Sequence, residues 1–184
     1  MQYILPSIRL WLVSFVICVV AYSALILAFA QSVAPFRANG SIIEIDGKAV
    51  GSELIAQKFT SPRYFWPRPS APDYNAMGAA GSNKSPTNPD LTERAKETLA
   101  AYGAESANPI PADLVAASGG GLDPHISLAG ALYQVERVAV SRGVAADQIE
   151  RLVRAEARAP GGPFAPEPIV NVLELNLALD RQGR

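Results

Sequence analysis

The sequence predicts an α+β protein, in which one N-terminal transmembrane helix precedes a small mixed α/β domain with long loops rich in proline and glycine. Residues 11–30 contain no charged side chain, and as a helix they would span about 30 Å, the thickness of the hydrocarbon core of a bilayer. Beyond this run, short β-prone and helical patterns alternate with loops that contain most of the 15 prolines and 14 glycines. The 184 residues are enough for one such domain.

The apolar run divides the chain into three parts. We expect a short cytoplasmic tail at residues 1–10, a transmembrane helix at 11–31 and an extracytoplasmic domain at 32–184. A cleaved signal peptide is the alternative, because Ala28-Phe29-Ala30 has the small-x-small form that signal peptidase accepts. The run is longer than the roughly 7–15 residues of a signal-peptide h-region, which favours a retained anchor.

Charge gives little information on the orientation of the helix. Arg9 and the amino terminus on one side face Arg37 and Lys48 on the other, so the positive-inside rule is nearly balanced. Long domains cross the membrane largely regardless of charge. We therefore expect a short tail inside and the bulk of the chain outside.

Local signals predict the elements that follow the apolar run. An Asp-Gly pair between two β-prone runs predicts a hairpin over 41–50, and a serine cap predicts a short helix over 52–59. Four prolines exclude regular structure from residues 61–72, and a polar loop continues over 78–89.

Caps and apolar periodicity predict four further helices and one strand. Asn88-Pro89 begins a helix over 90–102 that Gly103 ends, and Ser127 begins a helix that Gly143 ends. The remaining elements are a helix over 145–158, a short strand at Ile169–Val170 and a segment at Asn171–Asp180. The alternating leucines of this last segment also fit a strand. Its Leu, Ala and Asn residues are not β-branched, however, which favours a helix.

Composition excludes several classes of function. The 16 Lys and Arg residues against 17 Asp and Glu residues give a net charge of −1, so no overall positive field exists to hold nucleic acid. Cys18 is the only cysteine, which excludes an intramolecular disulfide and a cysteine-based zinc site. His125 is the only histidine, which excludes paired-histidine metal sites. We therefore predict no metal site and no nucleic-acid partner.

Segments distributed over the whole chain carry a family resemblance. Besides the N-terminal span they are Gly51-Ser-Glu-Leu-Ile-Ala-Gln57, Tyr64-Phe65, Arg68-Pro69-Ser70-Ala71, Gly81-Ser82-Asn83, Ser118-Gly-Gly-Gly-Leu122-Asp123-Pro124-His125-Ile126-Ser127, Gln134-Val135, Arg137-Val138-Ala139 and Asn171-Val-Leu-Glu-Leu-Asn-Leu-Ala-Leu-Asp180. Taken in this order, they resemble the C subunit of the Kdp-type potassium-transporting ATPase. Lys84 departs from the family pattern, which usually has an apolar residue there.

The resemblance implies a non-catalytic subunit of an ATP-driven complex, not an enzyme in its own right. It implies a single-pass protein of the bacterial inner (plasma) membrane with a periplasmic domain. The implied partners are the lipid bilayer, a channel-like potassium pore subunit, a P-type ATPase catalytic subunit and a small single-span peptide subunit. The family is also described as binding ATP, so ATP is the one cofactor that the resemblance implies, and Gln134 matches the proposed contact.

The residues themselves give weak support to nucleotide binding. No G-x-x-x-x-G-K-[ST] loop is present in the sequence. Ser118, Gly119 and Gly120 could form a nest of backbone N–H groups for an anion, although a plain glycine loop is the commoner structure. Gln134 could supply an amide contact, but an exposed polar residue on a helix is the simpler interpretation. A domain outside the membrane would also not meet cytoplasmic ATP.

Ser118, Asp123 and His125 supply the residue types of a hydrolytic triad, and an anchored hydrolase is therefore one alternative. Their surroundings do not form a G-x-S-x-G elbow, and proximity along the chain is not triad geometry. A structural account explains the same residues. In it, Asp123 bonds nearby backbone N–H groups, His125 is bonded to a loop carbonyl, and Ser127 caps the following helix.

The best candidate for a partner interface is the aromatic stretch of residues 63–68, because aromatic and arginine side chains are enriched at interface hot spots. The predicted interface consists of Arg63, Tyr64, Phe65, Trp66, Arg68, Ser82, Asn83, Asp123 and His125. Three alternatives exist for the aromatic stretch: it closes the core of its own domain, seats the domain on the membrane surface, or stacks single-stranded nucleic acid.

The sequence thus predicts a subunit that assembles and stabilises a high-affinity potassium uptake complex. Its helix is expected to dock beside the pore subunit, and its outer domain to cover the potassium entrance. A nucleotide-binding chaperone, which would raise the ATP affinity of the catalytic subunit, is the alternative function.

Overall fold

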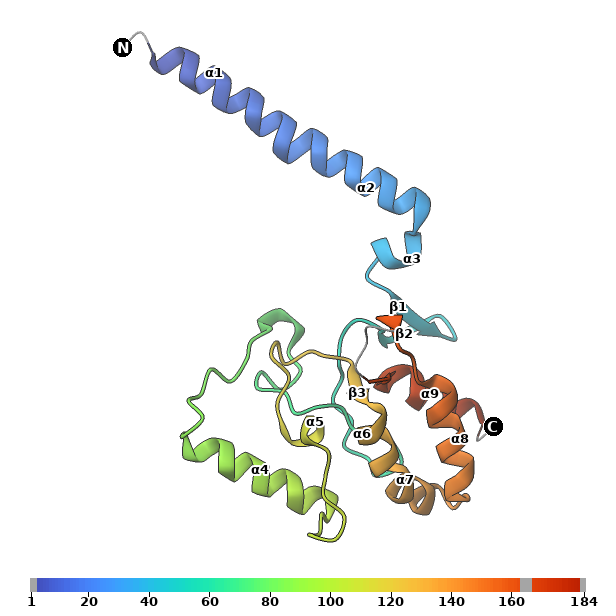
Figure 1. Ribbon diagram of the computed structural model, residues 1–184. Helices are drawn as coiled ribbons and strands as arrows, with labels where there is room; N and C mark the ends of the chain where they lie inside the picture. The colour runs from blue at the N-terminus through green and yellow to red at the C-terminus, as the bar shows by residue number, and fades with distance from the viewer. Residues whose placement is uncertain (1–2, 163–166, 183–184) are drawn as a thin grey trace. The chain divides into compact units, whose positions relative to one another are not determined.

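The computed structural model describes residues 3–162 and 167–182. The chain divides into two compact units, Met1–Val50 and Gly51–Arg184. Figure 1 shows an N-terminal helical rod in the first unit and a mixture of helices and short strands in the second. The predicted α+β class, with one apolar N-terminal helix, is confirmed at this level.

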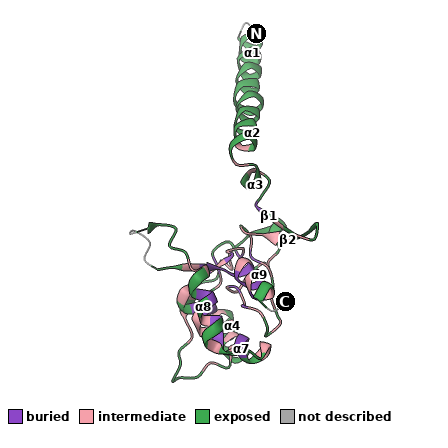
Figure 2. Ribbon diagram, turned by 90° about the vertical axis from the view of Figure 1, so that its right-hand side faces the viewer, coloured by how far each residue is buried: buried purple, intermediate pink, exposed green. Residues whose placement is uncertain are grey.

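The first unit is dominated by one continuous helix, Ile4–Val33, which is long and apolar enough to cross a membrane. It consists of α1 (Ile4–Phe15), a π-helical turn η1 (Val16–Ala21) and α2 (Tyr22–Val33). Figure 2 shows its surface exposed along almost the whole rod. Such a surface suits a lipid or protein environment, because water solvates apolar side chains poorly.

Two serines in this helix are bonded within it. The hydroxyl of Ser7 donates to the Tyr3 carbonyl, and that of Ser32 donates to the Ala28 carbonyl, both over 2.7 Å. Their polarity is thereby compatible with an apolar surrounding.

The helix extends beyond the expected residues 11–31 at both ends, so part of the expected tail at 1–10 is helical. Ile4, Leu5, Ile8 and Leu10 continue the apolar pattern, and Arg9 alone does not end it. After the helix come a single turn, α3 (Pro35–Ala38), and the predicted hairpin of β1 (Ile42–Ile45) and β2 (Lys48–Ser52). Asp46 and Gly47 both have positive φ at its turn, as two-residue hairpin loops require.

The second unit contains helices of one to four turns and a pair of three-residue strands. Its elements are η2 (Ala76–Gly78), α4 (Pro89–Tyr102), α5 (Ala112–Val115), β3 (His125–Ser127), α6 (Leu128–Tyr133), α7 (Val135–Arg142), α8 (Ala146–Glu156), β4 (Ile169–Asn171) and α9 (Val172–Gln182). Strands β3 and β4 are antiparallel, with Ile126 opposite Val170. Helices α6, α8 and α9 contact this strand pair.

A single apolar cluster forms the core of the second unit. In α8, Ile149, Leu152 and Val153 face inward at three- and four-residue spacing, which makes this helix amphipathic. The buried members of the cluster are Phe65, Leu114, Ile126, Ala131, Val135, Val138, Ala139, Ile149, Leu152, Val153, Val170, Val172, Leu175 and Leu179. The core thus joins both strands to helices α5–α9 and to one residue of the proline-rich segment.

Most of the predicted helices are confirmed. Asn88 caps α4 by accepting from the Asp90 N–H over 2.9 Å, and Ser127 caps α6 by accepting from the Gly130 N–H over 2.8 Å. The final segment is a helix, as predicted. The helix expected from Ser127 to Gly143 is interrupted at Gln134 and forms α6 and α7.

The helix predicted over residues 52–59 is wrong. Ser52 accepts from the Leu54 N–H over 3.1 Å and forms only a turn. The chain then runs irregularly, because the buried Ala56 donates its N–H to the Leu122 carbonyl over 3.0 Å instead of bonding within a helix. A tertiary hydrogen bond has overridden the local cap.

Candidate functional site

The proline-rich segment of residues 61–72, here called the aromatic segment, is held by one side-chain amide from α9 and one from the junction of α6 and α7. Asn176 of α9 accepts from the Phe65 N–H over 2.8 Å and donates to the Phe65 carbonyl over 3.0 Å. Gln134 does the same to Trp66, over 2.8 and 3.0 Å. Each amide thus bonds both the backbone N–H and the backbone carbonyl of one residue, as a neighbouring strand would.

These two amides are themselves buried. Gln134 is 0% exposed and Asn176 is 1% exposed. The expectation that Gln134 is an exposed polar residue is therefore wrong. It lies between α6 and α7 on the inward face that also carries Ala131, Val135 and Val138, and burial of an amide there requires hydrogen-bond partners.

Two arginines of α7 bind the same segment. Arg137 donates to the Pro62 carbonyl over 2.8 Å and to Gln134 Oε1 over 2.7 Å, and its guanidinium lies 3.9 Å from the centroid of the Trp66 ring. Arg142 donates to the Arg63 carbonyl over 2.8 Å and forms an ion pair with Asp180 over 2.8 Å. Partial burial lowers the pKa of Arg137, yet an arginine remains charged at neutral pH.

The aromatic rings of the segment divide between core and surface. Phe65 has no exposed area, which for this residue favours the alternative that the stretch closes its own core. Tyr64 donates its hydroxyl to Asp180 over 2.9 Å, and this hydrogen bond raises the pKa of Tyr64. Trp66 packs edge-on against Tyr102 of α4, with centroids 5.1 Å apart. Arg63 remains exposed and is the member most available to a partner.

Arg68, Asp123 and His125 meet at one point. Arg68 Nη1 lies 3.1 Å from Asp123 Oδ2, and Asp123 Oδ1 accepts from the His125 N–H over 3.0 Å, as the structural account of this loop predicts. His125 Nδ1 lies 3.4 Å from the same carboxylate, so the expectation that the ring bonds a loop carbonyl is wrong. Burial acts to raise the pKa of Asp123, but bonds from His125 and Arg68 together hold it below its ordinary value.

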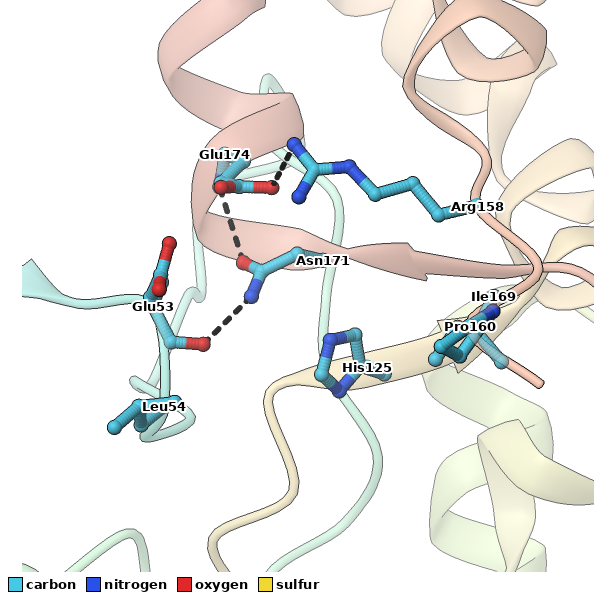
Figure 3. Close-up of a pocket in the computed structure, with 8 residues that line it drawn as sticks. All are labelled: Glu53, Leu54, His125, Arg158, Pro160, Ile169, Asn171 and Glu174. Atoms are coloured by element: carbon cyan, nitrogen blue, oxygen red, sulfur yellow. Dashed lines mark hydrogen bonds and ion pairs between the residues drawn. The ribbon is translucent and has the colours of Figure 1, made fainter. Parts of the chain in front are cut away.

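A hollow lies on one side of His125 and is shown in Figure 3. Asn171 bridges its wall by donating to the Glu53 carbonyl over 2.7 Å and accepting from the Glu174 N–H over 3.2 Å. Arg158 and Glu174 close the rim with an ion pair of 3.0 Å. His125 also lines a second hollow, which has Arg68, Asp113, Asp123, Ser127 and Glu167 among its other lining residues.

The structure does not bring Ser118 to this histidine. Ser118 is buried, its N–H donates to the Pro69 carbonyl over 3.1 Å, and no hydrogen bond joins it to His125 or Asp123 within residues 3–162 and 167–182. The three residue types of a triad are therefore close in sequence but not arranged as nucleophile, base and orienting acid.

The glycine loop that includes Gly119 and Gly120 packs against the aromatic segment. Gly121 has φ of +72°, and a Cβ there would lie 2.3 Å from Cδ of Pro72, so only glycine fits. Its N–H closes a turn by donating to the Ser118 carbonyl over 3.2 Å, and its carbonyl accepts from the Ser70 hydroxyl over 2.7 Å. A close approach between two loops thus explains Gly121, whereas a Cβ at Gly119 or Gly120 would meet nothing within 4 Å.

Ser82 and Asn83 lie in the loop before α4. Ser82 is half-buried and lines a hollow together with Ser70, Lys84 and Arg94. Asn83 is exposed with a left-handed backbone, φ +49°. The predicted interface residues thus fall into three groups: those of the aromatic segment, the Asp123 junction and this loop.

The residues that organise the site most directly were missed by the sequence argument. They are Asn176, Arg137, Arg142 and Asp180. One signal was available for Asn176, because it interrupts an apolar helical face between Leu175 and Leu179, where a polar side chain needs a partner.

Comparisons with known proteins cover almost the whole chain. Residues 4–181 match the family model KdpC, described as "K+-transporting ATPase, c chain". A potassium-transporting ATPase KdpC subunit of Parvibaculum lavamentivorans is 57% identical over 182 residues, which are 98% of this chain and 97% of the relative. Subunits of the same name from Burkholderia vietnamiensis and Paraburkholderia xenovorans are 50% and 46% identical, over 95% and 97% of this chain and 94% and 96% of theirs.

Proposed function

The chain belongs to the KdpC family of K+-transporting ATPase c chains, and on this premise we propose that it assembles and stabilises a high-affinity ATP-driven potassium uptake complex. It is the accessory member and not the catalytic one. Its partners in this proposal are the channel-like pore subunit, the P-type ATPase subunit and a small single-span peptide. The similarity over residues 4–181 carries the proposal, because it includes the apolar helix and the second unit alike.

The helix supplies the anchor in this proposal. The helix has 30 residues, and its most apolar stretch is not buried against the rest of the chain. It therefore needs bilayer lipid or a partner helix around it. We place it in the bacterial inner membrane beside the pore subunit. Small residues on it, such as Ala21, Ser23 and Ala24, would allow close helix contact there.

The second unit supplies the cover of the potassium entrance on the periplasmic side. Its aromatic segment is held rigidly by two buried amides and two arginines, so binding a partner would order few further groups. Arg63 presents an exposed guanidinium beside this rigid segment. A rigid arginine-bearing surface of this kind supports an interface role.

The alternative role as a nucleotide-binding chaperone requires Gln134 to contact ATP. Both ends of that amide are bonded to Trp66, and Arg137 donates to its oxygen as well. ATP would have to replace these buried hydrogen bonds, which favours assembly as the function. Titration of ATP into the full chain in detergent micelles, with Gln134→Ala beside the unaltered protein, measures this directly.

The side of the membrane is tested first by thiol labelling in intact cells. Cys18→Ser removes the only cysteine, and Ser106→Cys then places a thiol on an exposed turn. We expect an impermeant maleimide to label Ser106→Cys without permeabilisation. Labelling only after permeabilisation would contradict the outer-cover role and return attention to cytoplasmic ATP.

The assembly role is tested by co-purification. A tagged chain carrying Arg63→Glu should recover less pore and ATPase subunit than the unaltered chain, because the charge at the predicted interface is reversed. Arg154→Glu is the matched control, since Arg154 is also exposed but lies on α8 and pairs with Glu150 over 2.7 Å. Equal recovery with both variants would remove Arg63 from the interface.

A further inference from the structure

The guanidinium of Arg94 has no partner among the residues that the structure describes. Arg94 lies in the second turn of α4, and its Nε atom is shielded from solvent without a hydrogen bond. Across the described parts of the chain, no hydrogen bond, ion pair or ring contact involves its guanidinium. A shielded donor without an acceptor costs free energy, because the group has lost part of its hydration.

The helix itself offers carboxylates that Arg94 does not use. Asp90 lies four residues earlier and would be the ordinary helical partner, but it forms its ion pair with Lys84 instead. Glu93 pairs with Lys96 over 3.5 Å. Glu97, three residues later, forms no ion pair with Arg94 within the described residues. None of these three carboxylates therefore pairs with the Arg94 guanidinium within the described residues.

Arg94 instead lines a hollow between α4 and the loop before it. The other lining residues are Ser70, Ala71, Pro72, Ala80, Gly81, Ser82 and Lys84, and the volume is about 370 Å³. Ligand sites in proteins commonly measure roughly 300–1,000 Å³. No carboxylate is among the described residues that line it. Figure 1 shows α4 and this loop on the side of the unit away from α8 and α9.

The far wall of the hollow is rigid. Ser70 donates to the Gly121 carbonyl over 2.7 Å and accepts from the Tyr74 N–H over 2.8 Å, so its position is fixed. Gly81 sits so close to the glycine loop that a Cβ would lie 2.7 Å from the Gly119 carbonyl oxygen. Rigid walls bring the donors together before any ligand arrives.

We propose that this hollow binds an oxyanion, a phosphate group in particular, with Arg94 as the principal ligand. The guanidinium fork donates two parallel hydrogen bonds to such a group. The hydroxyl of Ser82 and the ammonium of Lys84, which keeps donors beyond its bond to Asp90, complete the set. The source is either free phosphate or the headgroup of an anionic lipid, since both present the same oxygens.

The test is NMR of the full chain, labelled with ¹⁵N, in nanodiscs of phosphatidylcholine. Inorganic phosphate is titrated at constant ionic strength, and the backbone amides of Gly81 and Ser82 are the reporters. We expect a saturable shift of both signals. Chloride at the same ionic strength should produce none.

Arg94→Gln should weaken phosphate binding at least tenfold, because the fork is lost. Arg154→Gln, which removes a paired and exposed arginine of α8, is the matched control and should leave the affinity unchanged. Ser82→Ala, read from the Gly81 amide, serves as a second variant with little risk to folding and should weaken binding severalfold. Absence of a saturable shift in the unaltered chain, or equal affinity in Arg94→Gln, would overturn the proposal.

The two sources are separated by adding phosphatidylglycerol to the nanodiscs. If the headgroup is the ligand, the two amides start at their shifted positions and phosphate moves them no further. If free phosphate is the ligand, the titration is the same in both nanodiscs. Either result requires Arg94 and therefore supports the site.

Discussion

Two consecutive irregular segments of this protein are held in different ways. The aromatic segment of residues 61–72 has four prolines and no glycine or asparagine, whereas the loop of residues 73–88 has one proline, two glycines and three asparagines. In the first, Phe65 and Pro67 are buried, and backbone groups are bonded by Gln134, Asn176 and Arg137 from distant helices. In the second, most residues are exposed, and the hydrogen bonds of η2 and the turn at Asn88 come from within the loop itself.

The difference lies in which groups bond the backbone of each segment. Four prolines remove backbone donors from the first segment, and one proline does so in the second. What distinguishes them is the supply of remote side-chain donors and acceptors for the backbone groups that remain.

Phe65→Ala should cost about 3–5 kcal/mol of the free energy of unfolding, because it opens a cavity in a closed core. Met77→Ala, in the other loop, should change it by less than about 0.5 kcal/mol, since Met77 is 96% exposed. Denaturant unfolding of the full chain in micelles, followed by near-ultraviolet circular dichroism, measures both. Similar costs for the two variants would refute the contrast between the loops.

Gln134→Ala should cost about 2–3 kcal/mol, because it leaves the buried N–H and carbonyl of Trp66 without partners. Gln148→Ala removes an exposed amide from α8 and should cost at most a few tenths of a kcal/mol. The same unfolding measurement applies. If the two glutamine variants are equally stable, the amide does not hold the aromatic segment.

Asp180→Asn should cost about 1 kcal/mol, because it weakens bonds to Tyr64 and Arg142 at a partly exposed site. In a double-mutant cycle, Tyr64→Phe and Asp180→Asn should cost less together than the sum of their separate costs, since they share one hydrogen bond. Additive costs would mean that the bond contributes nothing to stability.

Acid should remove a smaller contribution at the Asp123 junction. The pKa of this carboxyl is lower in the folded chain than in the unfolded one, so its contribution is fully present above about pH 4 and disappears as pH falls through the folded pKa. Asp123→Asn should therefore flatten the fall in stability below about pH 4. An unchanged acid profile, measured by thermal unfolding at each pH, would contradict the role of Arg68 and His125 in this shift.

The sequence by itself determined the features that depend on neighbouring residues. The apolar rod, the caps at Asn88 and Ser127, the glycine that ends α7 and the hairpin turn at Asp46 all follow from local backbone and side-chain chemistry. The family was also recognisable from motifs in order along the chain. The buried face of a helix whose apolar residues recur every three or four positions was predictable for the same local reason.

Only the tertiary structure decided what the polar residues do. Gln134 reads as an exposed helix residue until Trp66, 68 positions earlier, is brought beside it, and Asn176 meets Phe65 over a separation of 111 residues. The bond from Ala56 to Leu122 likewise replaced an expected helix, and the pairing of Asp90 with Lys84 left Arg94 facing a hollow. A polar side chain bonds whichever partner the packed core places within about 3 Å of it, and local sequence does not specify that partner.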